Sequence, residues 1–188
     1  MSKRSRSRQD VFPQTLTVGT GNGSANDYNV VQFALPISRL GGSASRAAVL
    51  EIIRVDYYLG IRDIEDLAGN TFLAYLTPSP THQGADTATL TSIEDDCKST
   101  INIAPVLRSF QTTTSGASTL EMPLSYDLTD GAGNGFLVAS DQLTLVSANV
   151  GGTTASSTVV KVWYRLVNVG MIEYVGILQS QGITKINS

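Results

Sequence analysis

The sequence has few of the residues that most catalytic mechanisms and metal sites require. Its 188 residues include one cysteine and one histidine. Cys97 cannot form a disulfide within the chain, and the two carboxylates before it disfavour a thiolate. His82 lies in a loop-like segment rich in proline, and it has no second imidazole with which to build a metal site. We therefore expect no cofactor, no metal and no enzymatic activity.

Carboxylates gather in two short clusters, and paired carboxylates can serve hydrolysis or bind a hard cation. Neither cluster has the spacing of an EF-hand loop. We interpret both as solvated charges in turns or at a helix start, with a Ca²⁺ site at a subunit contact as the alternative. The clusters are Asp63, Glu65 and Asp66, and Glu94, Asp95 and Asp96.

Long apolar runs are also missing. No stretch of 18 apolar residues occurs, and no hydrophobic segment follows the charged N-terminus, so we expect neither a membrane span nor a secretory signal. Charged residues make up only 15% of the chain and hydrophobic residues 41%. This composition predicts a single folded domain rather than a disordered chain.

Positive charge is concentrated at the N-terminus. Residues 1–8 read MSKRSRSR, and the four cations there are Lys3, Arg4, Arg6 and Arg8. The chain has 13 basic and 16 acidic residues, so the other nine basic residues leave the rest of the chain at −7. Such an arm can bind nucleic acid by releasing counterions from phosphates, or it can act as a solubilising terminus or a nuclear address. We treat residues 1–10 as a flexible arm, because alternating serine and arginine has no apolar periodicity.

From residue 11 onward, short strand-like runs alternate with clusters of Gly, Ser, Thr, Asn and Asp, which is typical of an all-β protein. The only helical hint is residues 61–68, and residues 15–19 form a candidate accessory strand. The eight main runs are residues 28–37, 49–59, 71–77, 87–91, 101–112, 119–126, 136–148 and 158–169.

Eight strands in residues 11–188 predict an antiparallel jelly-roll sandwich of two four-stranded sheets. An immunoglobulin-like sandwich is the nearest alternative, but it needs fewer residues. In residues 49–59 we expect the odd-numbered side chains, including Glu51, to share one face opposite Arg54 and Asp56. The glycine runs GTGNG and DGAGNG lack the spacing of a phosphate-binding loop, and we interpret them as hairpin turns.

One strand has the composition of a nucleic-acid-binding surface. In the run STVVKVWYRLVNV, alternation places Lys161, Trp163 and Arg165 on one face, opposite an apolar face. An aromatic ring between two cations can stack a base and neutralise phosphate. The alternative is a tryptophan packed under loops or at a subunit interface, with its two neighbours extending their charged ends into water.

The C-terminal third resembles a known family. The stretches DGAGNGFLVASDQL and VWYRLVNVGMIEYVGILQSQ are similar to segments of the capsid proteins of small circular single-stranded DNA viruses that encode a replication initiator protein (CRESS-DNA viruses). The resemblance covers residues 130–181 and includes the Tyr164-Arg165 pair and the segment from Glu173 to Gln181. It implies a jelly-roll coat protein without catalytic residues, preceded by a basic arm for genome binding and nuclear import.

The function implied is that of a capsid subunit. We expect it to assemble with itself, in about 60 copies, into an icosahedral shell that packages the single-stranded genome, in the virion and, during assembly, in the host nucleus. The candidate nucleic-acid-binding residues are Lys3, Arg4, Arg6, Arg8, Lys161, Trp163 and Arg165. The alternative is a trimeric jelly-roll module that binds a receptor or carbohydrate. A jelly-roll metal enzyme of the cupin type is disfavoured, because it needs several histidine ligands.

Overall fold

The computed structural model describes residues 7–8, 12–20, 27–37, 45–61, 70–78, 101–110, 124–151 and 156–181. Several sequence expectations lie outside these residues: Lys3, Arg4, Arg6, His82, Cys97, both carboxylate clusters, the strand at 87–91 and the helical hint after Ile61. The elements are β1 Ser7–Arg8, β2 Gln14–Gly19, β3 Tyr28–Ala34, β4 Arg46–Ile61, β5 Asn70–Thr77, β6 Ile103–Phe110, β7 Leu124–Asp127, β8 Phe136–Val138, β9 Gln142–Val150, β10 Ser156–Gly170 and α2 Met171–Ser180.

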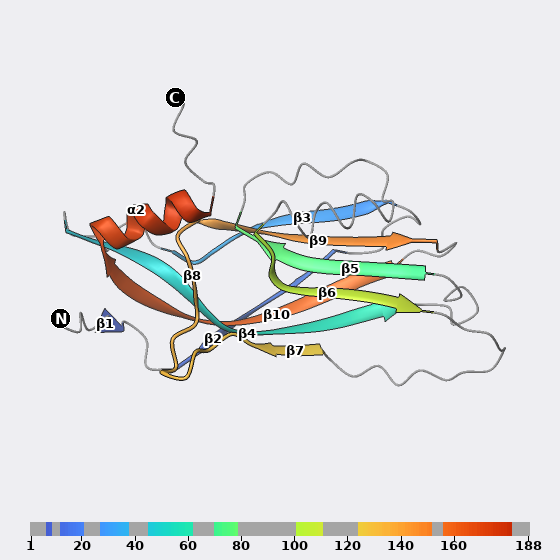
Figure 1. Cartoon of the computed structure of the whole chain (residues 1–188), viewed down its shortest axis with the longest axis horizontal. Coiled ribbons are helices and arrows are strands. Elements are labelled where there is room, and N and C mark those ends of the chain that lie inside the picture. Colours follow the sequence, from blue (N-terminus) through green and yellow to red (C-terminus); the bar gives the residue numbers. More distant parts are fainter. Residues whose placement is uncertain are drawn as a thin grey trace, which may run out of the picture.

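The strands form two antiparallel sheets that lie one above the other (Figure 1). One sheet has the order β3-β9-β5-β6. In the other, β10 lies between β4 and β2, and β7 and β8 both pair with the free edge of β4. Both β1 and β2 pair with β10, and counting β1 with β2 and β7 with β8 as interrupted strands gives two sheets of four. This order is that of a jelly roll, which confirms the predicted fold.

Two predicted strand assignments were wrong. Residues 136–148 were expected to form one strand, but β8 and β9 belong to different sheets. The chain turns the corner at Ser140 and Asp141, where the Ser140 hydroxyl accepts a hydrogen bond from the Gln142 amide and the Asp141 carbonyl accepts one from Leu35. β2 is an integral strand rather than an accessory one. Most of the GTGNG run lies outside the described residues, and the strands on either side of it, β2 and β3, belong to different sheets rather than to one hairpin.

A β-bulge at Ile53 changes which side chains of β4 face the core. Trp163 of β10 pairs with Arg54, and the next residue, Tyr164, pairs with Ile52, so Ile53 is an extra residue in β4. Leu50 and Ile52 therefore face the core before the bulge, and Val55, Tyr57 and Leu59 face it afterwards. The expectation of one face for all odd-numbered residues was wrong before the bulge, where Val49 and Glu51 point away from the core.

The DGAGNG run does not form the predicted hairpin turn. It lies in the loop between β7 and β8, which continue along the same edge of β4. This loop leaves the sheet at the bulge, where the Leu128 amide donates to the Ile53 carbonyl. Asp130 closes the loop, since its Oδ1 accepts hydrogen bonds from the amides of Ala132 and Asn134. The loop returns to the sheet at Gly135.

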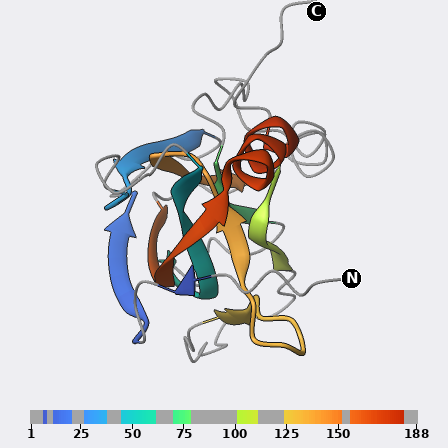
Figure 2. The same cartoon turned by 90° about the vertical axis from the view of Figure 1, so that its left-hand side faces the viewer.

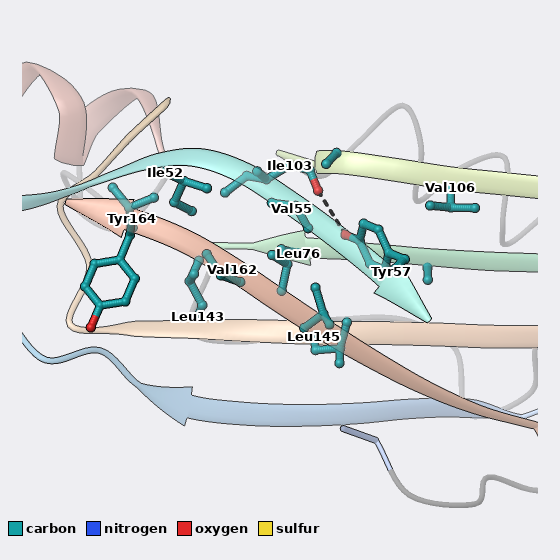
Figure 3. Packing of buried hydrophobic residues seen from close by; sticks show 14 of the residues in the cluster. Ile52, Val55, Tyr57, Leu76, Ile103, Val106, Leu143, Leu145, Val162 and Tyr164 are labelled. Atoms are coloured by element: carbon teal, nitrogen blue, oxygen red, sulfur yellow. Dashed lines mark hydrogen bonds between the residues drawn. The ribbon is translucent and has the colours of Figure 1, made fainter. Parts of the chain in front are cut away.

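The main core fills the space between the two sheets (Figure 3). Side chains of β4 and β10 meet those of β5, β6 and β9, including Val162, Leu76 and Leu145. Tyr57 is fully buried, and its hydroxyl donates to the Ile103 carbonyl across the core at 3.3 Å. Burial raises the pKa of Tyr57, so this hydroxyl stays protonated.

The helix α2 was missed by the sequence analysis. It follows β10 directly and lies over the end where β4 begins and β10 ends (Figures 1 and 2). Its N-cap, Gly170, provides no side-chain hydrogen bond, and a glycine interrupts its apolar run, so the local start and periodicity signals are weak. Its side chains form a second apolar cluster on the outer face of the sheet with Val49, Ala139, Val167 and Val169.

The side chain of Gln181, directly after this helix, forms hydrogen bonds to the backbone at β8. Its side-chain amide donates to the Leu137 carbonyl, and its Oε1 accepts a hydrogen bond of 3.2 Å from the Ala139 amide. Gln181 is only 4% exposed. The segment from Glu173 to Gln181 is therefore an integral part of the fold.

Candidate functional site

The outer face of β10 carries the predicted binding residues of the folded body. Val160, Val162 and Tyr164 are buried in the core, whereas Lys161, Trp163 and Arg165 are partly exposed on the opposite face. The predicted alternation of this strand is confirmed. Its partners on this face are β2 on one side and β4 on the other.

Trp163 is the centre of a compact group of four side chains, which we call the tryptophan cluster: Arg54, Asp56, Lys161 and Trp163. The Lys161 ammonium lies 4.5 Å from the centre of the indole ring, and the Arg54 guanidinium lies 5.9 Å from it. The indole N–H donates to Asp56 Oδ2 at 3.0 Å. Arg54 Nε donates to Asp56 Oδ1 at 2.7 Å. The ring is thus flanked by cations and anchored by a carboxylate.

Arg54 and Asp56 were not predicted as site residues. The alternation of β4 places both on one face, but their role depends on which strand lies beside them. In the structure Trp163 pairs with Arg54, and Lys161 pairs with Asp56. This pairing joins residues more than a hundred positions apart, and the sequence signal for it is confined to the alternation within each strand.

The environment of Asp56 favours its charged form. Partial burial acts in the opposite direction, but hydrogen bonds from Arg54, Ser125 and Trp163 hold the pKa of Asp56 below its ordinary value. The residue is only 3% exposed. A depressed pKa means that this carboxylate stabilises the fold above its unfolded pKa of about 4 and that the contribution is lost as the pH falls through the folded value.

Replacing Asp56 with asparagine tests this assignment. We expect Asp56→Asn to lower the free energy of unfolding by about 1–3 kcal/mol at pH 7, because Arg54 loses its charged partner and the indole N–H a charged acceptor. The difference from the wild type should shrink as the pH falls below about 4, the unfolded pKa of an aspartate. Denaturant unfolding at pH 7 and at a series of lower pH values, followed by circular dichroism, measures it. A difference that is the same at every pH would show that the carboxylate charge is not responsible.

Arg165 lies apart from the tryptophan cluster. It pairs across the strands with Glu51, which is 1% exposed. Glu51 Oε1 accepts a hydrogen bond of 3.0 Å from the Gly135 amide. Glu51 Oε2 and Arg165 Nε are both buried and have no hydrogen-bond partner. Arg165 therefore has a carboxylate as its strand neighbour, although the structure shows no hydrogen bond between them.

On β4, β7 and β10, charges of opposite sign are equal in number on this face. Its cations are Arg54, Lys161 and Arg165, and the carboxylates on the same described strands are Glu51, Asp56 and Asp127. Arg54 contributes to holding the pKa of Asp127 low, after the hydrogen bonds from Thr129. A face with no excess of positive charge attracts phosphate weakly, so cations from elsewhere would have to supply the attraction.

The N-terminal arm meets the same sheet. β1 pairs with β10, placing the backbone of Arg8 opposite Val167 and that of Ser7 opposite Asn168. Arg8 thus lies at a register position two residues from Arg165 along β10. Of the predicted arm, only Ser7 and Arg8 belong to the described residues. Their pairing brings the arm to the edge of the sheet that carries the other candidate residues.

A metal site and a membrane helix were not expected. Within the described residues, no three histidine, cysteine or acidic side chains converge as a cation would require. The same part of the chain contains no helix of sufficient length and apolar character to cross a membrane.

The fold is similar to solved polyomavirus coat proteins. Merkel cell polyomavirus VP1 in complex with disialyllactose has a TM-score of 0.53 and 11% identity, over 90% of this chain and 100% of that chain. The fold is a jelly roll, as in these VP1 structures. The human polyomavirus 6 VP1 pentamer has a TM-score of 0.54 and 11% identity, over 88% of this chain and 98% of that one.

A third similar structure is VP1 of the trichodysplasia spinulosa-associated polyomavirus in complex with GM1 oligosaccharide. Its TM-score is 0.52 and its identity 11%, over 88% of this chain and 98% of that chain. No protein-family model and no curated protein matches the sequence. The likeness is one of fold to polyomavirus VP1 structures, and the relation to CRESS-DNA viruses stays a prediction from the sequence.

Proposed function

We propose that this chain is the coat subunit of a small icosahedral virus with a single-stranded DNA genome, assembling in about 60 copies in the host nucleus. The observation that carries the proposal is the jelly-roll fold, which is similar to that of polyomavirus VP1 over almost the whole length of the matched chains. The acidic body agrees with it, because a charged surface limits nonspecific aggregation of shells.

Particle formation tests this function directly. The purified protein is expected to form closed shells that are visible by negative-stain electron microscopy and that scatter light as large particles. Two similar proteins are described as pentamers, so pentamers are the expected building unit of such shells. A monomer that persists across salt and pH, or discrete trimers with no larger species, would contradict the proposal. Trimers would favour the receptor- or carbohydrate-binding module instead.

We further propose that the arm binds the genome without sequence preference, through Lys3, Arg4, Arg6 and Arg8. On β4, β7 and β10 the outer sheet face has no excess positive charge, whereas residues 1–8 have four cations and no acid. Four phosphate contacts on a single strand imply a log–log salt slope of roughly −2.8. Deleting residues 2–6 leaves β1 and the sheets intact, so particles should form but contain less nucleic acid. The ratio of absorbance at 260 and 280 nm measures this content.

The outer face of β10 is the second proposed contact, and Trp163 reports on it. It is the only tryptophan in the chain, so intrinsic tryptophan fluorescence comes from the tryptophan cluster alone. If bases stack there, a single-stranded oligonucleotide should quench this fluorescence, and Lys161→Ala and Arg165→Ala should weaken the quenching. If an independent measurement shows that the oligonucleotide binds but the fluorescence is unchanged at saturation, the outer face of β10 is not a contact. The arm would then be the binding element.

A further inference from the structure

The helix α2 is apolar on two opposite sides. One side packs on the sheet through Tyr174, Ile177 and Leu178. At about 100° per residue, Ile172 and Val175 lie on the other side, away from the sheet. Ile172 is 83% exposed and Val175 is 43% exposed. A helix that is apolar all round is normally buried on all sides, and the described part of the subunit leaves the outer side of α2 uncovered.

The exposed side of α2 carries no charge. It consists of Ile172, Val175, Gly176 and Gln179, which we call the outer face of α2. The only acidic residue of the first turn is Glu173, and the last turn has no basic residue. At the helical spacing Glu173 points away from the centre of this face.

Nothing in the described part of the subunit requires a glycine at position 176. A Cβ at this position would meet no described atom within 4 Å, apart from the helix itself and its chain neighbours. Glycine in a helix interior is unfavourable relative to alanine, so a position with free space should not need it. A position without a side chain, between two apolar side chains, allows close approach of another surface. A contact with another surface would account for Gly176.

We propose that the outer face of α2 docks against a second copy of this chain in the assembled particle. This inference rests on the proposed capsid function. Outside residues 1–8 the chain carries a net charge of −7, the difference between nine basic and 16 acidic residues, so copies repel one another wherever charged surfaces meet. Two copies can approach each other through an uncharged apolar face without this electrostatic repulsion.

The size of this surface also fits an assembled particle. A helix of ten residues is roughly 15 Å long, and one face of it buries much less than the roughly 800 Å² per partner of a stable two-protein complex. The contact is therefore too small to hold an isolated dimer. It can act where several contacts around each subunit form together, as they do in a closed shell.

The test introduces a charge on this face without disturbing the subunit. Ile172→Lys should leave the circular dichroism spectrum and the melting temperature of the unassembled subunit unchanged, because the side chain is 83% exposed. Particle yield is expected to fall by roughly tenfold or more, since assembly would have to desolvate an unpaired ammonium group. The matched control is Leu107→Lys on β6, another exposed apolar residue, at 54%.

Gly176→Leu supplies a second variant that keeps the net charge. It adds bulk at a position where the described part of the subunit has space, so the melting temperature of the subunit should not fall and particle yield should. Normal particle yield in both α2 variants, or equal loss in Ile172→Lys and Leu107→Lys, would overturn the proposal. The wild-type chain distinguishes failure of this proposal from failure of the proposed function. If the wild type forms no particles, the proposed capsid function is wrong. If the wild type forms particles and the α2 variants behave like it, docking through the outer face of α2 is wrong.

Discussion

A chain that ends at Val169 is expected to be unfolded or insoluble. Removing α2 uncovers Val49, Val167 and Val169, which are 0%, 1% and 2% exposed in the intact protein. Exposing them costs roughly 1.5 kcal/mol or more each, so about 5 kcal/mol in all. The total stability of a domain of this kind is about 5–15 kcal/mol, and the truncation removes a large part of it.

The matched control for this truncation ends at Gln181. It retains α2 and the two hydrogen bonds from the Gln181 side chain to β8. We expect the chain that ends at Gln181 to be soluble, with a circular dichroism spectrum and a melting temperature close to those of the full chain. Wild-type solubility and particle formation by the chain that ends at Val169 would show that α2 is dispensable.

Replacing Gly135 with alanine is expected to have the second large effect. A Cβ on Gly135 would lie 2.1 Å from the Ile52 carbonyl oxygen and 2.8 Å from its carbon. Both atoms belong to the backbone of β4, so the clash cannot be relieved by a side-chain rotation. Relief requires β8 to move away from β4, which also breaks the hydrogen bond from the Gly135 amide to buried Glu51. We expect a loss of about 3 kcal/mol or more in the free energy of unfolding.

Gly131 provides the control in the same loop. A Cβ there would meet nothing within 4 Å, and its backbone is not in the left-handed region. Gly131→Ala should therefore change the free energy of unfolding by less than about 0.5 kcal/mol. Chemical denaturation of both variants beside the wild type measures the difference. Equal stability of Gly135→Ala and Gly131→Ala would mean that β8 does not pack against β4 as described.

The parts of the fold that the sequence predicted depend on short-range alternation. The faces of β10 were assigned correctly because polar and apolar side chains alternate there without interruption from Val160 to Tyr164. The same reasoning failed in β4, where the extra residue Ile53 exchanges the faces. A bulge is decided by how a strand pairs with its neighbours, and that pairing is not visible in one strand alone.

The candidate site was predicted in part for the same reason. Lys161, Trp163 and Arg165 were found from one strand, whereas Arg54 and Asp56 became part of the site only when β4 paired with β10. These added residues change the chemistry of the face. The carboxylates on this face offset the charge of its cations. We therefore expect the cations of the arm to provide most of the attraction for phosphate.

The sequence by itself determined the class of fold and the separation of charge. Regularly spaced strands without a long helix require two sheets packed face to face, and the placing of four cations in residues 1–8 is a property of the chain alone. Only the tertiary structure decided that residues 136–148 divide between two sheets and that the segment after β10 forms a helix. The physical reason is that both depend on long-range contacts: β8 is held by β4, and α2 packs on Val49 of the distant strand β4 as well as on the valines of β10.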